Sequence, residues 1–231
     1  MTLRTLSLAA LLGPALLAQA AKPTLHEALV AVREDRAGDP AVAAALGRLA
    51  KTHGTPLYVY DEAHIRGQAG ALQRAFGSRF PKLRILYALK ANTNPAVIGV
   101  LKSEGLGAEV VSVGEIETAL RVGYKGTEIL FTSSSKGPKE LTRAIALGTV
   151  LNVDSLDELG QIQAEARRQK KPARISFRVN PGVDPHTIHQ INTGIAESKF
   201  GLHLQGGLAL RAYERAKAMP EIRIEGVHCH I

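Results

Sequence analysis

The sequence predicts a parallel α/β fold, and three observations support this. Short apolar runs alternate with helical stretches over most of the chain, which is typical of strand–helix–strand units. The strand candidates are rich in Val, Ile and Leu, as strands covered on both faces are. No Gly-x-Gly-x-x-Gly follows an early strand, which disfavours a dinucleotide-binding sheet. An open doubly wound sheet and a barrel both fit this pattern.

The first 54 residues precede this alternation. Residues 1–22 combine a basic start, an apolar stretch and Ala-Gln-Ala, which fits a secretory signal, an N-terminal helix or a misassigned start codon. Gly13 and Pro14 interrupt the stretch, which makes it a poor membrane span. A helix is expected over residues 39–53, ended by Gly54. We therefore divide the chain into an N-terminal helical extension, 1–54, and an α/β domain, 55–231.

The α/β domain opens with an expected strand at 57–60 and a helix over about 61–75. Apolar runs then predict six strands, at residues 85–90, 108–112, 129–133, 150–153, 174–180 and 224–231. Helices are expected between most of them, at residues 95–103, 114–122, 138–147, 156–169 and 205–217. A TIM barrel closes with eight strands, so six leave it incomplete. We therefore expect a truncated chain.

The composition narrows the class of partner. Hydrophobic residues make up 45% of the chain and charged residues 22%, which is ordinary for a soluble globular protein. The net charge is +8, but the densest basic run, 167–171, lies at the end of a predicted helix, where cations suit the macrodipole. Aromatic residues are 4% and do not alternate with basic ones, so no nucleic-acid partner is expected. The single cysteine, Cys229, excludes an internal disulfide.

The first strand of the alternating series ends in a lysine. Reactive groups in parallel α/β folds collect at the C-terminal ends of strands. The sequence there is Tyr87-Ala88-Leu89-Lys90-Ala91-Asn92. We expect Lys90 to lie in a partly desolvated pocket, where burial favours the neutral amine that Schiff-base chemistry needs.

The run from Tyr87 to Gly105 resembles the cofactor-attachment signature of the ornithine/diaminopimelate/arginine decarboxylase family. That signature has an aromatic residue, Ala, a variable residue, Lys, a small residue and Asn. Hydrophobic positions follow at set spacing, and Val97-Ile98 and Leu101 match them here. The resemblance implies pyridoxal 5'-phosphate as cofactor and Lys90 as its Schiff-base lysine. It also implies a TIM-type (β/α)8 barrel with about six of eight strands present and the family's C-terminal β domain missing.

The segment 107–115 resembles the family's strand ending in Ser-Gly-Gly-Glu, which implies that Glu115 lies near the lysine and cofactor. A glutamate at a helix N-terminus, favoured by the macrodipole, is the alternative. Glu109 replaces the family's usual Asp and Val113 its usual Gly, and valine would be costly there if the backbone needs a positive φ. Arg178, flanked by apolar residues, should point into the barrel and needs an anionic partner, for which Glu109 and Glu115 are the candidates. The resemblance implies that Arg178 lies close to the cofactor, and a structural ion pair inside the barrel is the alternative.

The chain ends in Gly226-Val227-His228-Cys229-His230-Ile231. On a strand, His228 and His230 share one face. Other ligands for a metal ion are missing from the sequence, so no metal site is expected. The family has the same His-Cys-His-Ile motif, and the resemblance implies that His230 stacks on the pyridine ring.

The segments 189–194, His-Gln-Ile-Asn-Thr-Gly, and 198–201, Ser-Lys-Phe-Gly, resemble the diaminopimelate branch of the family. The implied reaction is decarboxylation of meso-2,6-diaminopimelate to L-lysine, with Thr193, Ser198 and Lys199 as candidate substrate-loop residues. Decarboxylases of ornithine, arginine or carboxynorspermidine, a racemase-like barrel and an inactive truncated fragment are the alternatives. The resemblance also implies a small amino-acid substrate, a homodimer in the full-length form, no membrane partner and a cytoplasmic location.

Overall fold

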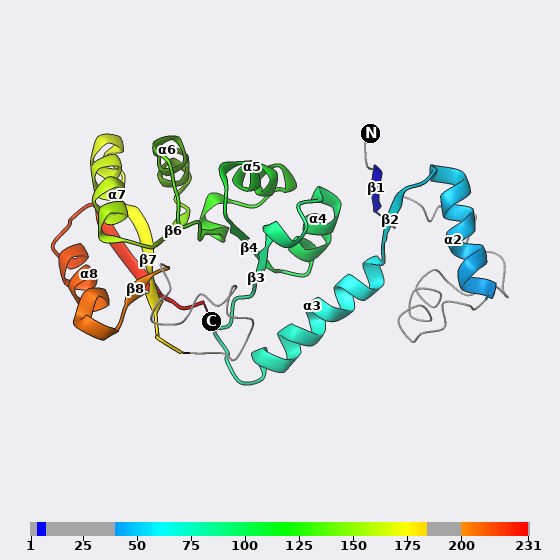
Figure 1. Cartoon of the computed structure of the whole chain (residues 1–231), viewed down its shortest axis with the longest axis horizontal. Coiled ribbons are helices and arrows are strands. Elements are labelled where there is room, and N and C mark those ends of the chain that lie inside the picture. Colours follow the sequence, from blue (N-terminus) through cyan, green and yellow to red (C-terminus); the bar gives the residue numbers. More distant parts are fainter. Residues whose placement is uncertain (1–3, 8–39, 184–199, 231) are drawn as a thin grey trace. The chain divides into compact units, whose positions relative to one another are not determined.

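The computed structural model of the chain describes residues 4–7, 40–183 and 200–230 (Figure 1). The chain divides into two compact units, Met1–Ile85 with Asn94–Leu106, and Leu86–Thr93 with Gly107–Ile231. Of the signal-like segment 1–22, only residues 4–7 are described. Within the described ranges, no helix has the length and apolar character needed to cross a bilayer.

The first unit contains short parallel strands and amphipathic helices. The helix expected over 39–53 is confirmed, and Gly54 follows it with a φ of 81°. Asp61 and Asn94 begin the next two helices by accepting hydrogen bonds from the backbone N–H groups of His64 and Ala96, at 3.1 and 2.9 Å. The described elements of this unit are β1 (Arg4–Ser7), which pairs with β2 (Leu57–Tyr60), and α2 (Pro40–His53), α3 (Glu62–Gly77) and α4 (Pro95–Ser103).

The second unit is a parallel sheet with helices between its strands. In strand order it contains β3 (Leu86–Ala88), β4 (Gly107–Val110), β5 (Ile129–Phe131), β6 (Val150–Val153), β7 (Ala173–Asn180) and β8 (Leu202–His203), and β9 (Ile222–His228) also pairs with β7. The connecting helices are α5 (Val113–Val122), α6 (Pro138–Leu147), α7 (Leu156–Gln169) and α8 (Leu208–Lys217). Helices α5, α6 and α7 stand in a row along one side of the sheet (Figure 1). The predicted parallel α/β fold is confirmed.

Local sequence signals set the ends of these helices. The hydroxyls of Ser112 and Ser155 accept hydrogen bonds from the third residues of α5 and α7, at 3.2 and 3.1 Å, and so cap both helices where the strands end. Gly123 and Gly148 end α5 and α6 in the left-handed region, with φ values of 97° and 72°. These caps return the chain to the next strand with the same orientation, which a parallel sheet requires.

The core of the second unit lies between the sheet and its helices. Consecutive residues of the central strands are buried, which confirms that both faces of these strands are covered. Ile116, Leu159 and Ile162 are fully buried on the helices. The fully buried strand residues include Val110, Phe131, Leu151, Val153, Ile175 and Phe177.

The structure departs from the sequence prediction at several element ends; for example, the strands expected over 108–112 and 129–133 end at Val110 and Phe131. The strand expected over 85–90 ends at Ala88, and a 3-10 turn, Leu89–Ala91, follows. The helix expected over 205–217 is divided, because Gly206 and Gly207 both have positive φ, so that α8 begins only at Leu208. The two-residue strand β8 was not predicted, since a run this short carries no period-2 signal.

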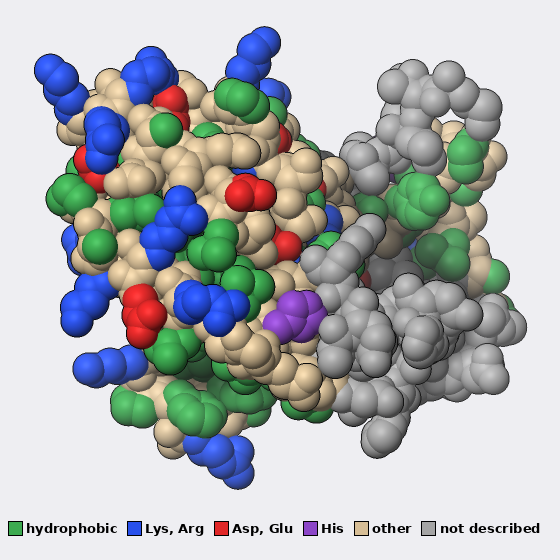
Figure 2. All heavy atoms as spheres, turned by 60° about the vertical axis from the view of Figure 1, so that its left-hand side comes forward, with side chains coloured by type: hydrophobic (Ala, Val, Ile, Leu, Met, Phe, Trp, Pro, Cys, Tyr) green, Lys and Arg blue, Asp and Glu red, His purple; other side chains and the backbone are tan. Residues whose placement is uncertain are grey.

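Basic side chains are dispersed over one face of the described part of the protein. On the face shown in Figure 2, Lys and Arg side chains project at several separate places. The predicted interpretation of the run 167–171 as a helix end is confirmed, because α7 ends at Gln169. Arg167 and Arg168 in its last turn pair with Glu221 and Glu165, at 2.8 and 2.7 Å.

Candidate active site

Polar and charged side chains gather at the C-terminal ends of the strands in the second unit. Arg178 on β7 is in register with His228 on β9, and Ala88, two residues before Lys90, is in register with Glu109 on β4. Burial and then the positive charges of Arg178 and Lys90 lower the pKa of His230, while Glu109 opposes this. The charged groups of four strand ends therefore act on one another, as a catalytic site in a parallel α/β fold requires.

Lys90 follows β3 in the 3-10 turn Leu89–Ala91. The expectation of a partly desolvated pocket is wrong for this lysine, whose side chain is exposed, whereas Leu89 beside it is fully buried. The strand ends two residues earlier than predicted, and a bond from Asn92 N–H to Leu89 O of 3.1 Å closes the turn. The turn therefore places Leu89 in the core and the lysine amine in solvent.

Glu115 lies in the first turn of α5 and is tied to its own loop. Its Oε2 accepts a hydrogen bond of 2.8 Å from the N–H of Val111. This geometry supports the helix N-terminal interpretation, and a position beside the cofactor stays a prediction. Val113 is the first residue of α5 and is not among the described residues with positive φ, so the valine there causes no backbone strain.

Glu109 points from β4 toward the neighbouring strand end. Its Oε1 accepts a hydrogen bond from the hydroxyl of Thr132, which follows β5. The carboxylate also acts on the histidines of the last strand, because it raises the pKa of His228 and of His230 against the lowering effect of burial. Glu109 is thus the acidic member of a cluster that also contains Lys90, Arg178, His228 and His230.

Arg178 has a partner that the sequence analysis missed. Its Nη1 lies 3.6 Å from Oδ1 of Asp154, and both side chains are largely buried. The partners expected from the sequence were Glu109 and Glu115, but the ion pair found in the described part of the chain is with Asp154. This aspartate follows β6, whose end lies beside β7, so the parallel order of the strands was the signal that would have identified it.

Asp154 and Arg178 both contact the start of the described segment 200–230. Oδ2 of Asp154 accepts a hydrogen bond of 3.2 Å from Gly201 N–H, and the Arg178 guanidinium lies 4.8 Å from the centre of the Phe200 ring. Gly201 has a φ of 74°. A Cβ atom on it would lie 2.9 Å from the carbonyl oxygen of Arg178.

Gly201→Ala is therefore expected to destabilise the fold by about 1–3 kcal/mol, because it combines a positive φ with a backbone clash. Urea unfolding of the variant measures this loss. Gly182→Ala is the matched control, since Gly182 has a similar φ of 68° but no atom near the position of the added Cβ. A loss equal to that of the control would mean that the close approach to Arg178 contributes nothing.

His228 contacts a buried polar pair on the neighbouring strands. Its Nδ1 lies 3.3 Å from Nδ2 of Asn152, and Oδ1 of Asn152 accepts a hydrogen bond of 2.9 Å from the Ser176 hydroxyl. Burial lowers the pKa of His228, and the positive charges of Arg178 and His230 lower it further. Cys229 and His230 lie beyond the end of β9 and are exposed, as is most of the turn of Lys90.

The lowered pKa values of the two histidines predict a loss of stability in mild acid. Below their usual pKa the unfolded chain takes up protons that the folded chain resists, so the free energy of unfolding falls as pH decreases from 7.5 to 5.5. Urea unfolding at several pH values measures the slope, and His228→Gln should reduce it. An unchanged slope in that variant would contradict the lowered pKa.

Comparison with known proteins assigns the chain to a family. Residues 63–231 match the pyridoxal-dependent decarboxylases, over their pyridoxal binding domain. The chain belongs to this decarboxylase family. Diaminopimelate decarboxylases of Aquifex aeolicus and Archaeoglobus fulgidus are 41% and 40% identical over 187 and 178 residues, which cover 80% and 77% of this chain. These stretches are 43% and 41% of the two relatives, so the chain spans less than half of their length.

Solved structures of the decarboxylase family have the same fold. The diaminopimelate decarboxylase of Helicobacter pylori complexed with L-lysine has a TM-score of 0.73 at 36% identity, over 80% of this chain and 46% of that one. The enzyme of M. jannaschii in co-complex with L-lysine has a TM-score of 0.72 at 36% identity, over 80% and 44%. The sheet of the second unit therefore belongs to the pyridoxal-binding barrel of the family, as the sequence predicted.

The described residues fit a pyridoxal group. The amine of Lys90 is exposed and forms no hydrogen bond or ion pair within the described part of the chain, so it is available for covalent attachment. His230 is also exposed, and the positive charge of Lys90 helps to lower its pKa; its stacking on the pyridine ring stays a prediction. The substrate-loop candidates Thr193, Ser198 and Lys199 lie outside the described residues. Among the residues that are described, no group of three metal-ligating side chains could hold a metal ion.

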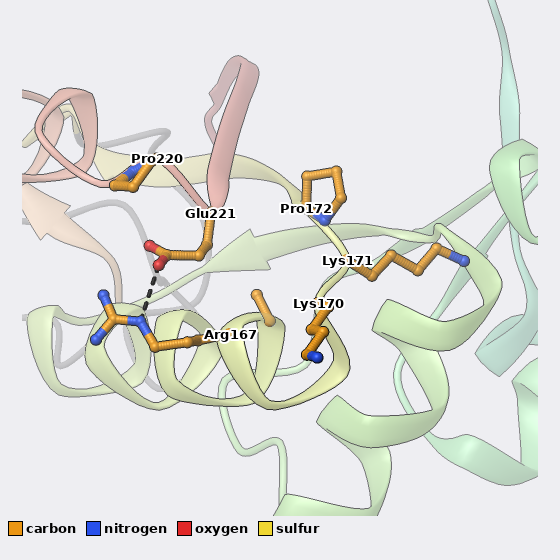
Figure 3. A pocket seen from close by; sticks show the side chains of 7 residues that line it. Arg167, Lys170, Lys171, Pro172, Pro220 and Glu221 are labelled. Carbon is orange, nitrogen blue, oxygen red and sulfur yellow. Dashed lines mark hydrogen bonds and ion pairs between the residues drawn. The ribbon is translucent and has the colours of Figure 1, made fainter.

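A hollow lies at the opposite, N-terminal ends of the strands (Figure 3). It lies before β7 and β9 and is lined by Lys170, Lys171, Pro172 and Pro220. Arg167 and Glu221 point toward each other across it and form an ion pair of 2.8 Å. Side chains at the N-terminal ends of barrel strands usually serve stability, and this ion pair fits that role.

Proposed function

We propose that this chain is the cofactor-binding part of a diaminopimelate decarboxylase, which releases CO2 from meso-2,6-diaminopimelate and yields L-lysine. The observation that carries the proposal is the exposed Lys90 at a strand end, whose positive charge acts on His230, as the carboxylate of Glu109 also does. The family membership of the chain and the relatives at 36–41% identity, which are diaminopimelate decarboxylases, support it.

Four residues at the strand ends, Lys90, His230, Glu109 and Arg178, have a role in this proposal. Bound pyridoxal phosphate supplies the electron sink for the carbanion that decarboxylation leaves. Lys90 would hold the cofactor through Nζ, and as a free amine it could hold and return a proton. His230 stacks on the pyridine ring, and Glu109 and Arg178 set the local charge. The fit rests on the exposure of Lys90 and on its coupling to this cluster.

The proposal also covers Glu115, the substrate loop and the properties of the whole protein. Glu115 lies near the cofactor, and Thr193, Ser198 and Lys199 contribute to the substrate loop. The full-length protein acts as a homodimer on a small amino acid in the cytoplasm. Residues 55–231 belong to the barrel and 1–54 form an extension.

A second substrate class has one observation in its favour. The structure of a lysine/ornithine decarboxylase from Vibrio vulnificus, complexed with putrescine, has a TM-score of 0.64 and 26% identity to this chain. The identity to diaminopimelate decarboxylases is higher, and the segment 189–194 resembles that branch. We therefore place diaminopimelate before ornithine and lysine.

The substrate test uses this chain expressed together with the coding sequence that follows it. Release of labelled CO2 is measured from meso-diaminopimelate, ornithine, arginine and lysine, with Lys90→Arg as the inactive control. Diaminopimelate is expected to react at least about 100-fold faster than the others, because a site that binds its distal amino-carboxylate leaves polar groups unpaired with substrates that lack the distal carboxylate. Faster release from ornithine or lysine would overturn the proposed substrate.

A further inference from the structure

Asn152 links the buried part of the sheet to His228 at the end of β9. Asn152 is fully buried and is the last residue but one of β6. It is in register with Ser176 on β7, which is also buried. Its amide nitrogen faces Nδ1 of His228 on β9, at 3.3 Å. Three adjacent strands therefore contribute one polar chain, Ser176–Asn152–His228.

The direction of the hydrogen bonds in this chain follows from the amide. The Ser176 hydroxyl donates to Oδ1 of Asn152 at 2.9 Å, which leaves Nδ2 toward the histidine. An amide nitrogen only donates, so Nδ1 of His228 must accept and carries no proton. The ring proton is then on Nε2, and an imidazolium would set two N–H donors against each other.

The backbone around Asn152 is held in place independently. The buried ammonium of Lys136 donates to the Asn152 carbonyl oxygen at 2.7 Å and to Oε1 of Glu158 at the same distance. Oε2 of Glu158 accepts from Asp154 N–H at 2.7 Å. The backbone at the end of β6 is thus held by the Lys136–Glu158 pair, and it carries the amide of Asn152 toward the ring.

The charged groups around His228 disfavour its protonation as well. Arg178 faces it from β7 and His230 from its own chain end, and both lower its pKa after burial. Glu109 on β4 and Asp154 after β6 act in the opposite direction. A hydrogen bond from Asn152 adds a directional preference that these charges lack, because charge alone does not select between the two neutral tautomers.

We propose that Asn152, oriented by Ser176, is a positioning residue that holds His228 neutral with its proton on Nε2. This rests on the proposed function in one respect, namely that His230, two residues later, lies against the cofactor. A neutral, fixed His228 keeps the number of cations at the strand ends constant around neutral pH. It also fixes the chain end that carries His230.

The test is nitrogen NMR of histidine side chains in this chain labelled with 15N-histidine. The chain has eight histidines, and His228→Gln assigns the signal by its disappearance. In the wild-type protein at pH 7, the proton is expected on Nε2, with a titration midpoint below the usual value for histidine. A proton on Nδ1 means that the amide is reversed, and either this or an imidazolium at pH 7 overturns the proposal.

Asn152→Asp replaces the amide donor by an acceptor of the same shape. It should raise the midpoint of His228 by about one pH unit or more and move the neutral proton to Nδ1. Asn180→Asp is the matched control, because Asn180 lies at the end of β7 and its Nδ2 donates to Phe200 O rather than to His228. Equal shifts in both variants would assign the effect to added charge and overturn the proposal.

Two features keep the test decisive. If Asn152→Asp does not fold, Ser176→Ala replaces it, and a lower share of the Nε2–H form is expected because the amide is freed. An unchanged share in Ser176→Ala would contradict the orienting role of Ser176. The NMR readout needs no cofactor, so failure to label Lys90 with pyridoxal phosphate would leave the tautomer result intact and would count only against the proposed function.

Discussion

Lys90→Ala is expected to abolish covalent capture of pyridoxal phosphate by this chain. A Schiff base needs a primary amine that is accessible, and Lys90 is exposed at the end of β3, where its positive charge acts on His230. Incubation with pyridoxal phosphate followed by borohydride reduction, and peptide mapping by mass spectrometry, measures the attachment site. The label is expected on the peptide with Lys90 in the wild-type protein and nowhere in the variant.

Two further variants separate the site from general lysine reactivity. Lys90→Arg keeps the positive charge but has no primary amine, so it should also lose the label. Lys139→Ala removes an exposed lysine of α6 and should leave labelling unchanged. Labelling of Lys90 that is no stronger than that of other exposed lysines would remove the basis for placing the cofactor there.

The fold was largely predictable because local and tertiary signals agree. The helices at 95–103, 138–147 and 156–169 were predicted with the bounds that the structure has, since Pro at the first turn or a Ser cap marks where each begins. The strand at 150–153 was also predicted with its bounds. Strand ends were harder, because an apolar run such as 85–90 continues into a turn without any change in composition.

The site was predictable only in part. A lysine, an arginine and two histidines at strand ends were recognisable from the sequence, because their positions follow from the order of the strands. The burial of Lys90 was predicted wrongly, since the residue that enters the core at a strand end depends on where the strand stops. Asn152 and Asp154 were missed, because their partners are set by the pairing of β7 with both β6 and β9, and an isolated Asn or Asp carries no signal of this.

Lys136→Met is expected to lower the free energy of unfolding by about 3–5 kcal/mol, because it leaves a buried carboxylate without its cation. The Lys136 side chain is fully buried, and its Nζ lies 2.7 Å from Oε1 of Glu158, whose side chain is 9% exposed. Burial lowers the pKa of Lys136, and the attraction of Glu158 opposes this. Urea unfolding followed by circular dichroism measures the loss.

Helix α7, which carries Glu158, also provides a matched control and a second substitution that should restore stability. Glu165 on α7 pairs with Arg168 at 2.7 Å, but the arginine is 63% exposed, so Arg168→Met should leave the free energy of unfolding nearly unchanged. Adding Glu158→Gln to Lys136→Met should recover much of the loss, because glutamine keeps an acceptor for Asp154 N–H and carries no charge. If the double variant were no more stable than Lys136→Met, the loss would come from the packing of the lysine stem. The Lys136–Glu158 pair would then hold the end of β6 by shape alone.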